Sequence, residues 1–386
     1  MDGVKILSDL ISIDTSVPPG ANYDKLIAYL KPILQELLPE VEEILIPPEY
    51  TYDHHPRKNI LAHHHDPTKP RLIFYSHIDT VPAQGWEYTR PIIEDGKIYG
   101  RGAADMKGSL VAFLLALEKI KDREPKFDIS LMVTTDEEIG QADQLRYLKS
   151  FLEPVKGAYI FDLDSSFGYV SITGLGAIHM SITVKGKSVH SAMSHMGKNA
   201  VEGACQLANS LLELKKEVLK RKSCTPAAPD SGLEKMEPRL NINLIQGGLK
   251  VNIVPDECHL AIDRRLIPEE DITSAEDEIK KALDGLPDVE WEITNIFRIP
   301  PVPPLEDPLV DQLADIIYQV TGKTGKYGEM GSGDLGHIAN FEWQAKHFGL
   351  GVIRPECSIH GRNEFVYIKD IEDLATIIAR FLLEWA

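Results

Sequence analysis

Short apolar runs alternate with polar clusters along this chain, and this alternation constrains its fold more than any other feature of the sequence. The runs 71–76 (RLIFYS), 129–135 (ISLMVTT) and 157–162 (GAYIFD) have the length and composition of buried strands. Between the first two lies 108–120 (GSLVAFLLALEKI), which is apolar almost all round, as in a helix packed on a sheet. The pattern predicts an α/β fold with a mostly parallel central sheet flanked by helices.

Amphipathic stretches are available to cover such a sheet. Apolar residues recur at helical spacing within 23–45, before the break at PPEY (47–50). The stretches 309–320 and 371–385 have the same spacing, and GLGVI at 349–353 is predicted to be a strand between them. The alternation therefore resumes near the C-terminal end of the chain.

In the middle of the chain the order of predicted strands and helices changes, which indicates a second domain. At 386 residues the chain exceeds the roughly 250 to 300 residues that a single hydrophobic core usually reaches. The order strand, helix, strand, strand is predicted for the segments 178–186, 198–221, 241–248 and 258–266. We therefore expect a discontinuous catalytic domain, 1–172 and 298–386, interrupted by a smaller α+β domain at 173–297.

Composition excludes several classes of partner. The net charge of -18 disfavours nucleic acid and anionic lipid, because phosphate binding requires clustered Lys and Arg. No apolar run approaches the ~20 residues that a membrane helix needs. The N-terminal stretch MDGVKILSDLISIDTS is amphipathic with an early acid and does not fit a secretory signal. These features predict a cytoplasmic protein with no membrane partner.

Histidine and acidic residues come directly after the predicted strands. SHIDTVP (76–82) follows the first strand, TTDEEIG (134–140) follows the second, and Asp162 ends the third. Since the carboxyl ends of strands form the ligand crevice of open α/β sheets, these side chains are predicted to converge. Nitrogen and oxygen ligands suit zinc, and two such ions can act together on a carbonyl group. In the adjacent pair Glu137 and Glu138, one acid can bind metal while the other takes a proton.

Four motifs identify a family. SHIDTVP, GRGAADMKG, TTDEE and the late SIHGRNEF, in this order and spacing, resemble those of a zinc peptidase and deacylase family. That family includes acetylornithine deacetylase, succinyl-diaminopimelate desuccinylase, aminoacylase and glutamate carboxypeptidase. The resemblance implies two Zn²⁺ ions, with Co²⁺ as a possible substitute, and a ferredoxin-like inserted domain that acts as lid and dimerisation surface.

The resemblance also assigns roles to individual residues of the metal site. The implied ligands are His77 and Asp162 for one zinc ion, His360 and Glu138 for the other, and Asp105 as the bridge. Asp79 resembles the carboxylate that orients the imidazole of His77. Glu137 matches the general base, and the family has a cis peptide bond after the bridging aspartate, here between Asp105 and Met106.

One of these ligands has an alternative. The stretch Asp162-Leu163-Asp164 offers two aspartates, and alignment of AYIFD favours Asp162. Most deacylases of the family have a glutamate followed by proline at this position. An aspartate is closer to the dipeptidase and tripeptidase branches, so the substrate class is also left open here.

The predicted inserted domain and a later loop resemble the substrate-binding parts of the family. His190 matches a histidine that reaches into the active site of a dimer partner and stabilises the oxyanion. Asn252 and Arg265 match residues that bind the carboxylate of the substrate, for which the planar guanidinium of arginine is suited. Gly331 and Gly333 lie in GEMGSGDLG, which resembles the loop that lines the substrate pocket.

Together these features predict a homodimeric hydrolase of N-acyl amino acids. In the mechanism that the resemblance implies, a metal-bridged hydroxide, formed with Glu137 as general base, attacks the amide carbonyl. The nearest alternative is a carboxypeptidase or dipeptidase acting on a short peptide with the same groups. Two more distant alternatives are a two-metal phosphoesterase and a metal-free binding protein with the same fold.

Overall fold

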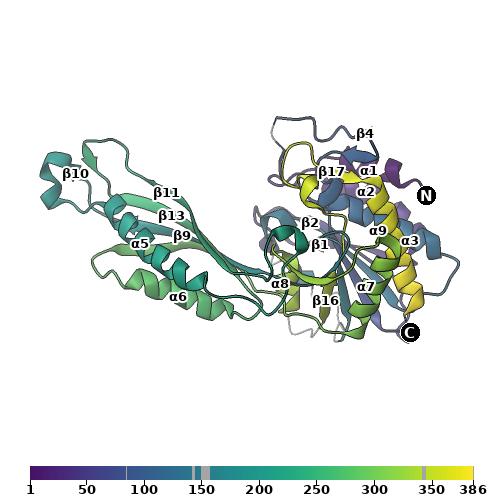
Figure 1. Cartoon of the computed structure of the whole chain (residues 1–386). Coiled ribbons are helices and arrows are strands. Elements are labelled where there is room, and N and C mark those ends of the chain that lie inside the picture. The colour runs from purple at the N-terminus through teal and green to yellow at the C-terminus, as the bar shows by residue number, and fades with distance from the viewer. Residues whose placement is uncertain (84, 141–143, 149–156, 341–344, 386) are drawn as a thin grey trace. The chain divides into compact units, whose positions relative to one another are not determined.

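The computed structural model describes residues 1–386 except 84, 141–143, 149–156, 341–344 and 386. The described chain divides into two compact units, and Figure 1 labels many of their elements. The first unit contains Met1–Thr173, Pro304–Glu329 and Gly333–Ala386, and the second contains Gly174–Pro303 and Met330–Ser332. The second unit extends beyond the expected boundary at 297, because a strand continues to Ile299.

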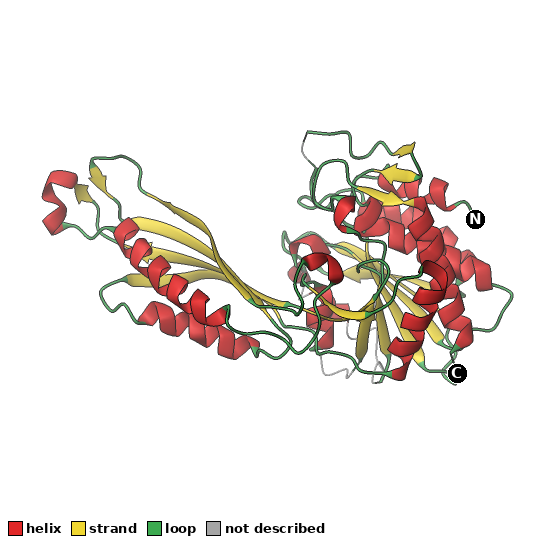
Figure 2. Cartoon of the chain, in the orientation of Figure 1, coloured by secondary structure: helices red, strands yellow, loops and turns green. Residues whose placement is uncertain are grey.

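The first unit is built on a mixed sheet with a parallel centre (Figure 2). Among the described residues, the sheet has eight strands in the order β1-β2-β6-β3-β7-β16-β8-β15. These strands are β1 Glu40–Ile46, β2 Arg57–His63, β3 Arg71–His77, β6 Asp128–Thr134, β7 Tyr159–Asp162, β8 Val170–Gly174, β15 Lys326–Glu329 and β16 Lys346–Gly349. Strands β6, β3, β7 and β16 pair in parallel, whereas β1, β2 and β8 pair antiparallel. The predicted helix-flanked α/β fold is confirmed.

Helices pack on this sheet and enclose the core of the first unit. They are α1 Gly3–Ile11, α2 Tyr23–Leu37, α3 Gly108–Ile120, α7 Pro308–Thr321, α8 Asp334–Ala339 and α9 Ile368–Glu384. Helix α3 is apolar on nearly every side because α9 and α1 pack against it and its side chains join the sheet core. A small sheet of β4 Ile92–Glu94, β5 Lys97–Tyr99 and β17 Phe365–Tyr367 adjoins the turn before α3.

Two of the predicted elements are wrong in part. The helix expected over 23–45 ends at Leu37, and 40–46 forms β1, because this segment pairs in register with β2 along its whole length. Pairing within a sheet here overrides helical spacing, as tertiary contacts commonly do. The strand expected at 349–353 is observed as β16, which begins three residues earlier, at Lys346, and ends four residues earlier, at Gly349. Helix α1, N-capped by Asp2, was not predicted as a separate element.

The second unit is a four-stranded antiparallel sheet with two helices. Its elements, in chain order, are β9 Gly176–Lys185, α5 Ala200–Val218, β11 Arg239–Gly247, β13 Glu257–Leu266, α6 Ile272–Asp284 and β14 Glu290–Ile299. The strand order β11-β13-β9-β14 and the β-α-β-β-α-β sequence make this unit ferredoxin-like. The sequence pattern missed α6 and β14. Across the described residues of both units, none of the helices has the length and apolar character needed to span a bilayer.

Candidate metal centre

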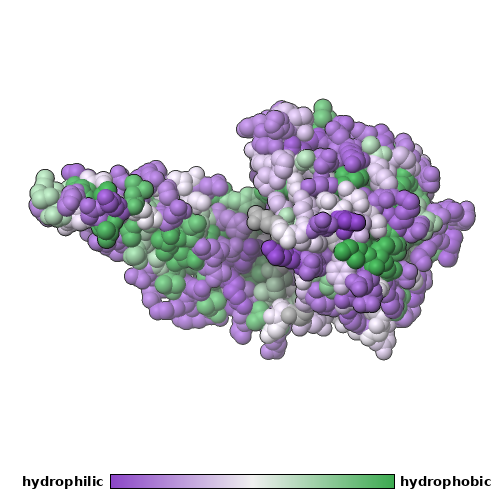
Figure 3. Space-filling view, turned by 90° about the horizontal axis from the view of Figure 1, so that it is seen from above, coloured by the Kyte–Doolittle hydropathy of each residue, from purple (hydrophilic) through white to green (hydrophobic). Residues whose placement is uncertain are grey.

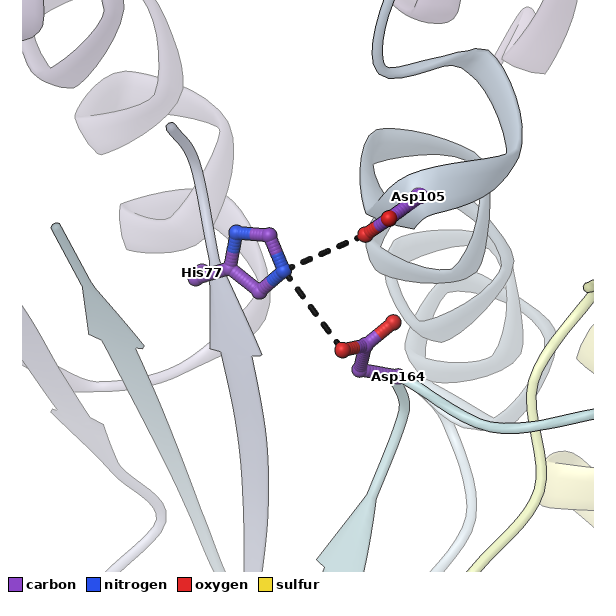
Figure 4. Close-up of side chains that lie close together, drawn as sticks. All are labelled: His77, Asp105 and Asp164. Atoms are coloured by element: carbon purple, nitrogen blue, oxygen red, sulfur yellow. Dashed lines mark ion pairs between the residues drawn. The ribbon is translucent and has the colours of Figure 1, made fainter. Parts of the chain in front are cut away.

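Three neighbouring strands bring the acidic and histidine residues of the first unit together. His77 is the last residue of β3, the Glu137-Glu138 pair follows β6, and Asp164 follows β7. Since β6, β3 and β7 are parallel neighbours, their carboxyl ends lie at one edge of the sheet. Asp105 reaches this edge from the turn before α3, as Figure 4 shows, and the Asp105–Met106 peptide bond is cis.

The carboxylate of Asp105 lies between two histidines. Its Oδ1 is 3.4 Å from Nε2 of His77, and its Oδ2 is 3.0 Å from Nε2 of His360. Asp164 Oδ2 lies 3.6 Å from the same nitrogen of His77 (Figure 4), and Glu138 Oε2 lies 3.1 Å from Nε2 of His360. Two groups of three candidate ligands therefore share one carboxylate, and the candidate donor atoms within each group lie within 4.8 Å of one another.

The residues of both groups fit a pair of divalent cations. His77 is fully buried, and its Nε2 makes no hydrogen bond to any of the described residues although two carboxylates face it. A buried ring nitrogen with no hydrogen bond, turned toward two carboxylate oxygens, is the arrangement of a metal ligand. Carboxylates gathered in a buried site require a compensating charge, which two cations would supply. The nitrogen and oxygen donors match those that zinc accepts.

The electrostatics of the site reflect this crowding of acids. Burial and the charge of Asp105 raise the pKa of Glu138 to about 7. Hydrogen bonds to Asp105 and Glu138 raise the pKa of His360 to about 10. For Asp105, burial alone would raise the pKa, but the His360 and His77 side chains lower it below its ordinary value. A cation that binds here therefore competes with protons for the same groups.

The structure favours Asp164 over Asp162 as the third member of the His77 group. Asp162 Oδ1 accepts the backbone N–H of Asp164 at 3.0 Å, so this carboxylate is used to close the turn after β7. Asp164 then carries the carboxylate that faces His77. The prediction of Asp162 rested on alignment of AYIFD, and the turn after β7 instead places the alternative, Asp164, opposite His77.

Asp79 connects the two halves of the site. Its Oδ1 lies 3.5 Å from Nδ1 of His77, and its Oδ2 accepts the backbone N–H of Glu138 at 3.0 Å. The same ring nitrogen of His77 lies 3.2 Å from the backbone carbonyl of Asp79. Asp79 is fully buried. It therefore occupies the position expected of a carboxylate that orients a ligating imidazole.

A buried ion pair that the sequence interpretation did not assign connects the segments that carry Asp105 and His360. Glu364 Oε1 accepts the backbone N–H groups of Ala104 and Asp105 at 3.0 and 3.2 Å. Its Oε2 lies 2.6 Å from Nη1 of Arg101, whose Nη2 donates to the carbonyl of Gly361. Arg101 and Glu364 thus tie the Asp105 turn to the His360 loop. Arg101 lies in the motif GRGAADMKG and Glu364 lies in SIHGRNEF. Their place within these two motifs is the sequence signal that could have identified them.

Glu137 faces the same edge of the sheet next to Glu138. Burial and the nearby charge of Asp334 raise the pKa of Glu137 well above its ordinary value. Asp334 itself accepts a hydrogen bond from Tyr75 at 2.6 Å. A Cβ on Gly333 would stand 2.9 Å from Oε1 of Glu137, so this glycine gives the carboxylate its space. Gly333 therefore contacts a candidate catalytic group directly.

The remaining predicted residues belong to the second unit, and each is described there by itself. His190 ends β10 (Val189–His190), which pairs with β12 (Ile253–Val254), and Ser191 donates to the carbonyl of Asn252. His190 and Asn252 therefore lie close together, and both are exposed. Gly331 accepts the backbone N–H of Leu175 through its carbonyl.

The paired arginines of DRRLIP differ in role. Arg265 points its Nε at the carboxylate of Asp263, at 2.9 and 3.1 Å, and its Nη1 at Ser332. Arg264 is fully buried and paired with Glu270. Arg264 is therefore a structural residue, while the half-buried Arg265 is the one able to meet a ligand.

Comparison with known proteins found similar sequences and similar structures. A family model described as Peptidase family M20/M25/M40 matches residues 73–384. Succinyl-diaminopimelate desuccinylase of Marinobacter nauticus is 30% identical over 335 residues, which cover 82% of this chain and 83% of that protein. An M20 family metallo-carboxypeptidase of Sulfolobus solfataricus has the same fold, with a TM-score of 0.80 at 18% identity and 99% of both chains covered. A dinuclear metal-binding M20 peptidase of Bacillus subtilis superposes with a TM-score of 0.64 at 13% identity, covering 98% of this chain and 96% of that one.

Proposed function

Because this chain belongs to peptidase family M20/M25/M40 and is a metal-dependent amide hydrolase, we propose that it cleaves the amide bond of N-acyl amino acids with Glu137 as general base. The observation that carries the proposal is the Asp105 carboxylate, which turns one oxygen to His77 and the other to His360. A carboxylate shared in this way is what a pair of adjacent cations requires.

The proposed metal ligands are the residues of the two groups. His77 and Asp164 would hold one ion, His360 and Glu138 would hold the other, and Asp105 would be shared by both. Two Zn²⁺ ions are proposed, with Co²⁺ able to replace them. When bound, the ions supply Lewis acidity that polarises the scissile carbonyl group and makes a nearby water easier to deprotonate.

Glu137 performs the proton transfers in the proposed reaction. Its carboxylate takes a proton from the attacking water and returns it to the nitrogen of the departing amine. A general base works best when its pKa lies near the working pH, and burial together with Asp334 shifts the pKa of Glu137 in that direction. Asp79 contacts both His77 and the backbone of Glu138. These contacts hold Glu137 in place beside the proposed ligands.

The acyl amino acid is proposed as the substrate because the relatives that match most of this chain are named desuccinylases. The second candidate is a carboxypeptidase or dipeptidase. An aspartate rather than a glutamate at the proposed ligand position 164 favours this candidate. A panel of N-acetyl and N-succinyl amino acids, dipeptides and an aryl phosphate, assayed with added zinc or cobalt, separates these functions. The acylated amino acids are expected to turn over fastest. Faster dipeptide hydrolysis would support the peptidase, and hydrolysis confined to the phosphate would overturn both.

The second unit is proposed to act as lid and dimerisation domain. Leu249 and Val251, on the loop after β11, are 97% and 98% exposed, and further hydrophobic side chains lie on the surface of this unit in Figure 3. Exposed apolar side chains beside His190 and Asn252 suit contact with a second copy of the chain. His190 would then serve the neighbouring site as an oxyanion donor, while Asn252, Arg265 and Gly331 bind substrate. We expect a homodimer by light scattering, and we also propose a cytoplasmic location.

Replacing Gly333 with alanine is expected to lower kcat by about tenfold, because small displacements of a reacting group are costly. The backbone conformation of Gly333 (φ -151°) accepts any residue, so the effect comes from the new Cβ displacing the Glu137 carboxylate. Gly331→Ala is the matched variant, because its Cβ meets none of the described atoms within 4 Å. Gly331→Ala should alter KM alone, and steady-state kinetics that show an equal loss of kcat in both variants would contradict this.

A further inference from the structure

Asp136, the residue before Glu137, has a backbone conformation that few residues adopt. Its φ of 65° and ψ of 24° lie in the left-handed region, at the point where β6 passes into the Glu137-Glu138 turn. Aspartate tolerates this region better than most residues, but the conformation still has to be held by its surroundings. The orientation of this residue decides where the two following glutamates point.

Two buried side chains hold the Asp136 carboxylate. The hydroxyl of Tyr23 donates to Oδ1 at 2.7 Å, and Nε of Arg57 donates to Oδ2 at 2.9 Å. Tyr23, Arg57 and Asp136 are only 5%, 5% and 1% exposed. In such surroundings both oxygens of the carboxylate have a fixed donor, so rotation of the Asp136 side chain would leave a buried charge without partners.

The donors are themselves fixed from elements far away in the sequence. Tyr23 is the first residue of α2, and Arg57 is the first residue of β2. Nη2 of Arg57 lies 3.0 Å from the carboxylate of Asp53, and its guanidinium lies 5.5 Å from the centre of the Tyr23 ring. Neither residue belongs to the motifs that mark the metal site, so nothing in those motifs accounts for this network.

We propose that Tyr23 and Arg57 are positioning residues, which hold the Asp136 turn so that Glu137 and Glu138 face the metal site. The inference rests on the proposed function for Glu137, but for Glu138 it depends on metal binding alone. If the turn loosens, the proton-accepting carboxylate and one metal ligand both lose their fixed place. Displacement of a catalytic group by about 1 Å can cost orders of magnitude in rate.

The chain offers a matched pair of variants. Tyr23→Phe removes the hydroxyl that donates to Asp136, and Tyr29→Phe removes one that donates to Asp9, also at 2.7 Å and also from α2. The bond of Tyr29 joins α2 to α1, and neither Tyr29 nor Asp9 belongs to the candidate ligand groups. For the metal-loaded full-length protein, Tyr23→Phe is expected to lower kcat roughly tenfold with KM unchanged. We also expect it to weaken binding of the second Co²⁺ ion several-fold in a titration followed by visible absorption. Tyr29→Phe should leave both quantities at the wild-type level.

The outcomes separate the inference from the proposed function. A change in kcat or in cobalt affinity confined to Tyr23→Phe supports the positioning role. Equal behaviour of the two variants, either unchanged or equally impaired, overturns it. If the wild-type protein hydrolyses nothing in the substrate panel, the proposed function fails, and the cobalt titration alone then decides whether Tyr23 positions the turn. Arg57→Lys keeps a cation near Asp136 and should retain more activity than Arg57→Met.

Discussion

Replacing Glu137 with glutamine is expected to lower kcat by about 10²- to 10⁴-fold, the range typical for loss of a general base. The amide is nearly the same size as the carboxylate, so it fits in the space beside Gly333 without a new collision. It cannot take a proton from water, and that step would then proceed without a base. Both metal ions should remain bound, since the two ligand groups do not contain Glu137.

Two further variants make this result specific. Glu138→Gln alters a ligand facing His360, so it should reduce the metal content as well as the rate. Glu137→Asp keeps a carboxylate but sets it back by one methylene, and it should retain more activity than Glu137→Gln. Steady-state kinetics together with metal analysis give both quantities. Turnover of Glu137→Gln close to wild type, with two ions bound, would show that another group is the base.

The parts of the fold that the sequence predicted are those in which local pattern and tertiary environment agree. Helix α3 was predicted with its observed bounds because it is buried on nearly all sides. Its apolar run therefore has the same length as the helix. Strand β1 was missed because its exposed face carries acids and its apolar residues extend the spacing of the preceding helix. The segment forms a strand because it pairs with β2. A short stretch of sequence around β1 does not include this partner.

The same distinction applies to the site. Residues placed directly by a strand end or a motif, such as His77 and Glu138, lie where the sequence indicated. The residues that support them were missed, because Glu364 acts through backbone N–H groups and Tyr23 acts through a third residue. Hydrogen bonds between distant segments leave no periodic signal in a sequence. Arg101 and Glu364 nevertheless matter, since removing one member of a buried ion pair commonly costs about 3 to 5 kcal/mol.

The choice between Asp162, the last residue of β7, and Asp164, two residues later, gives the second large effect. Asp164→Ala removes a carboxylate that faces His77, so the protein is expected to bind one ion tightly instead of two. Activity should fall by at least about 100-fold, because even changes to residues that only support ligands cost 10- to 100-fold. Equilibrium dialysis with zinc measures the stoichiometry, and kinetics measure the rate.

Asp162→Asn is the informative counterpart, because it tests the position that the strand end alone suggests. The amide oxygen of asparagine can still accept the backbone N–H of Asp164, so the turn should keep its shape and two ions should bind. If instead Asp162→Asn lost an ion and Asp164→Ala kept both, the ligand would be the last residue of β7. The difference between the two variants therefore tests whether the turn hydrogen bond of Asp162 leaves Asp164 as the acid that binds metal.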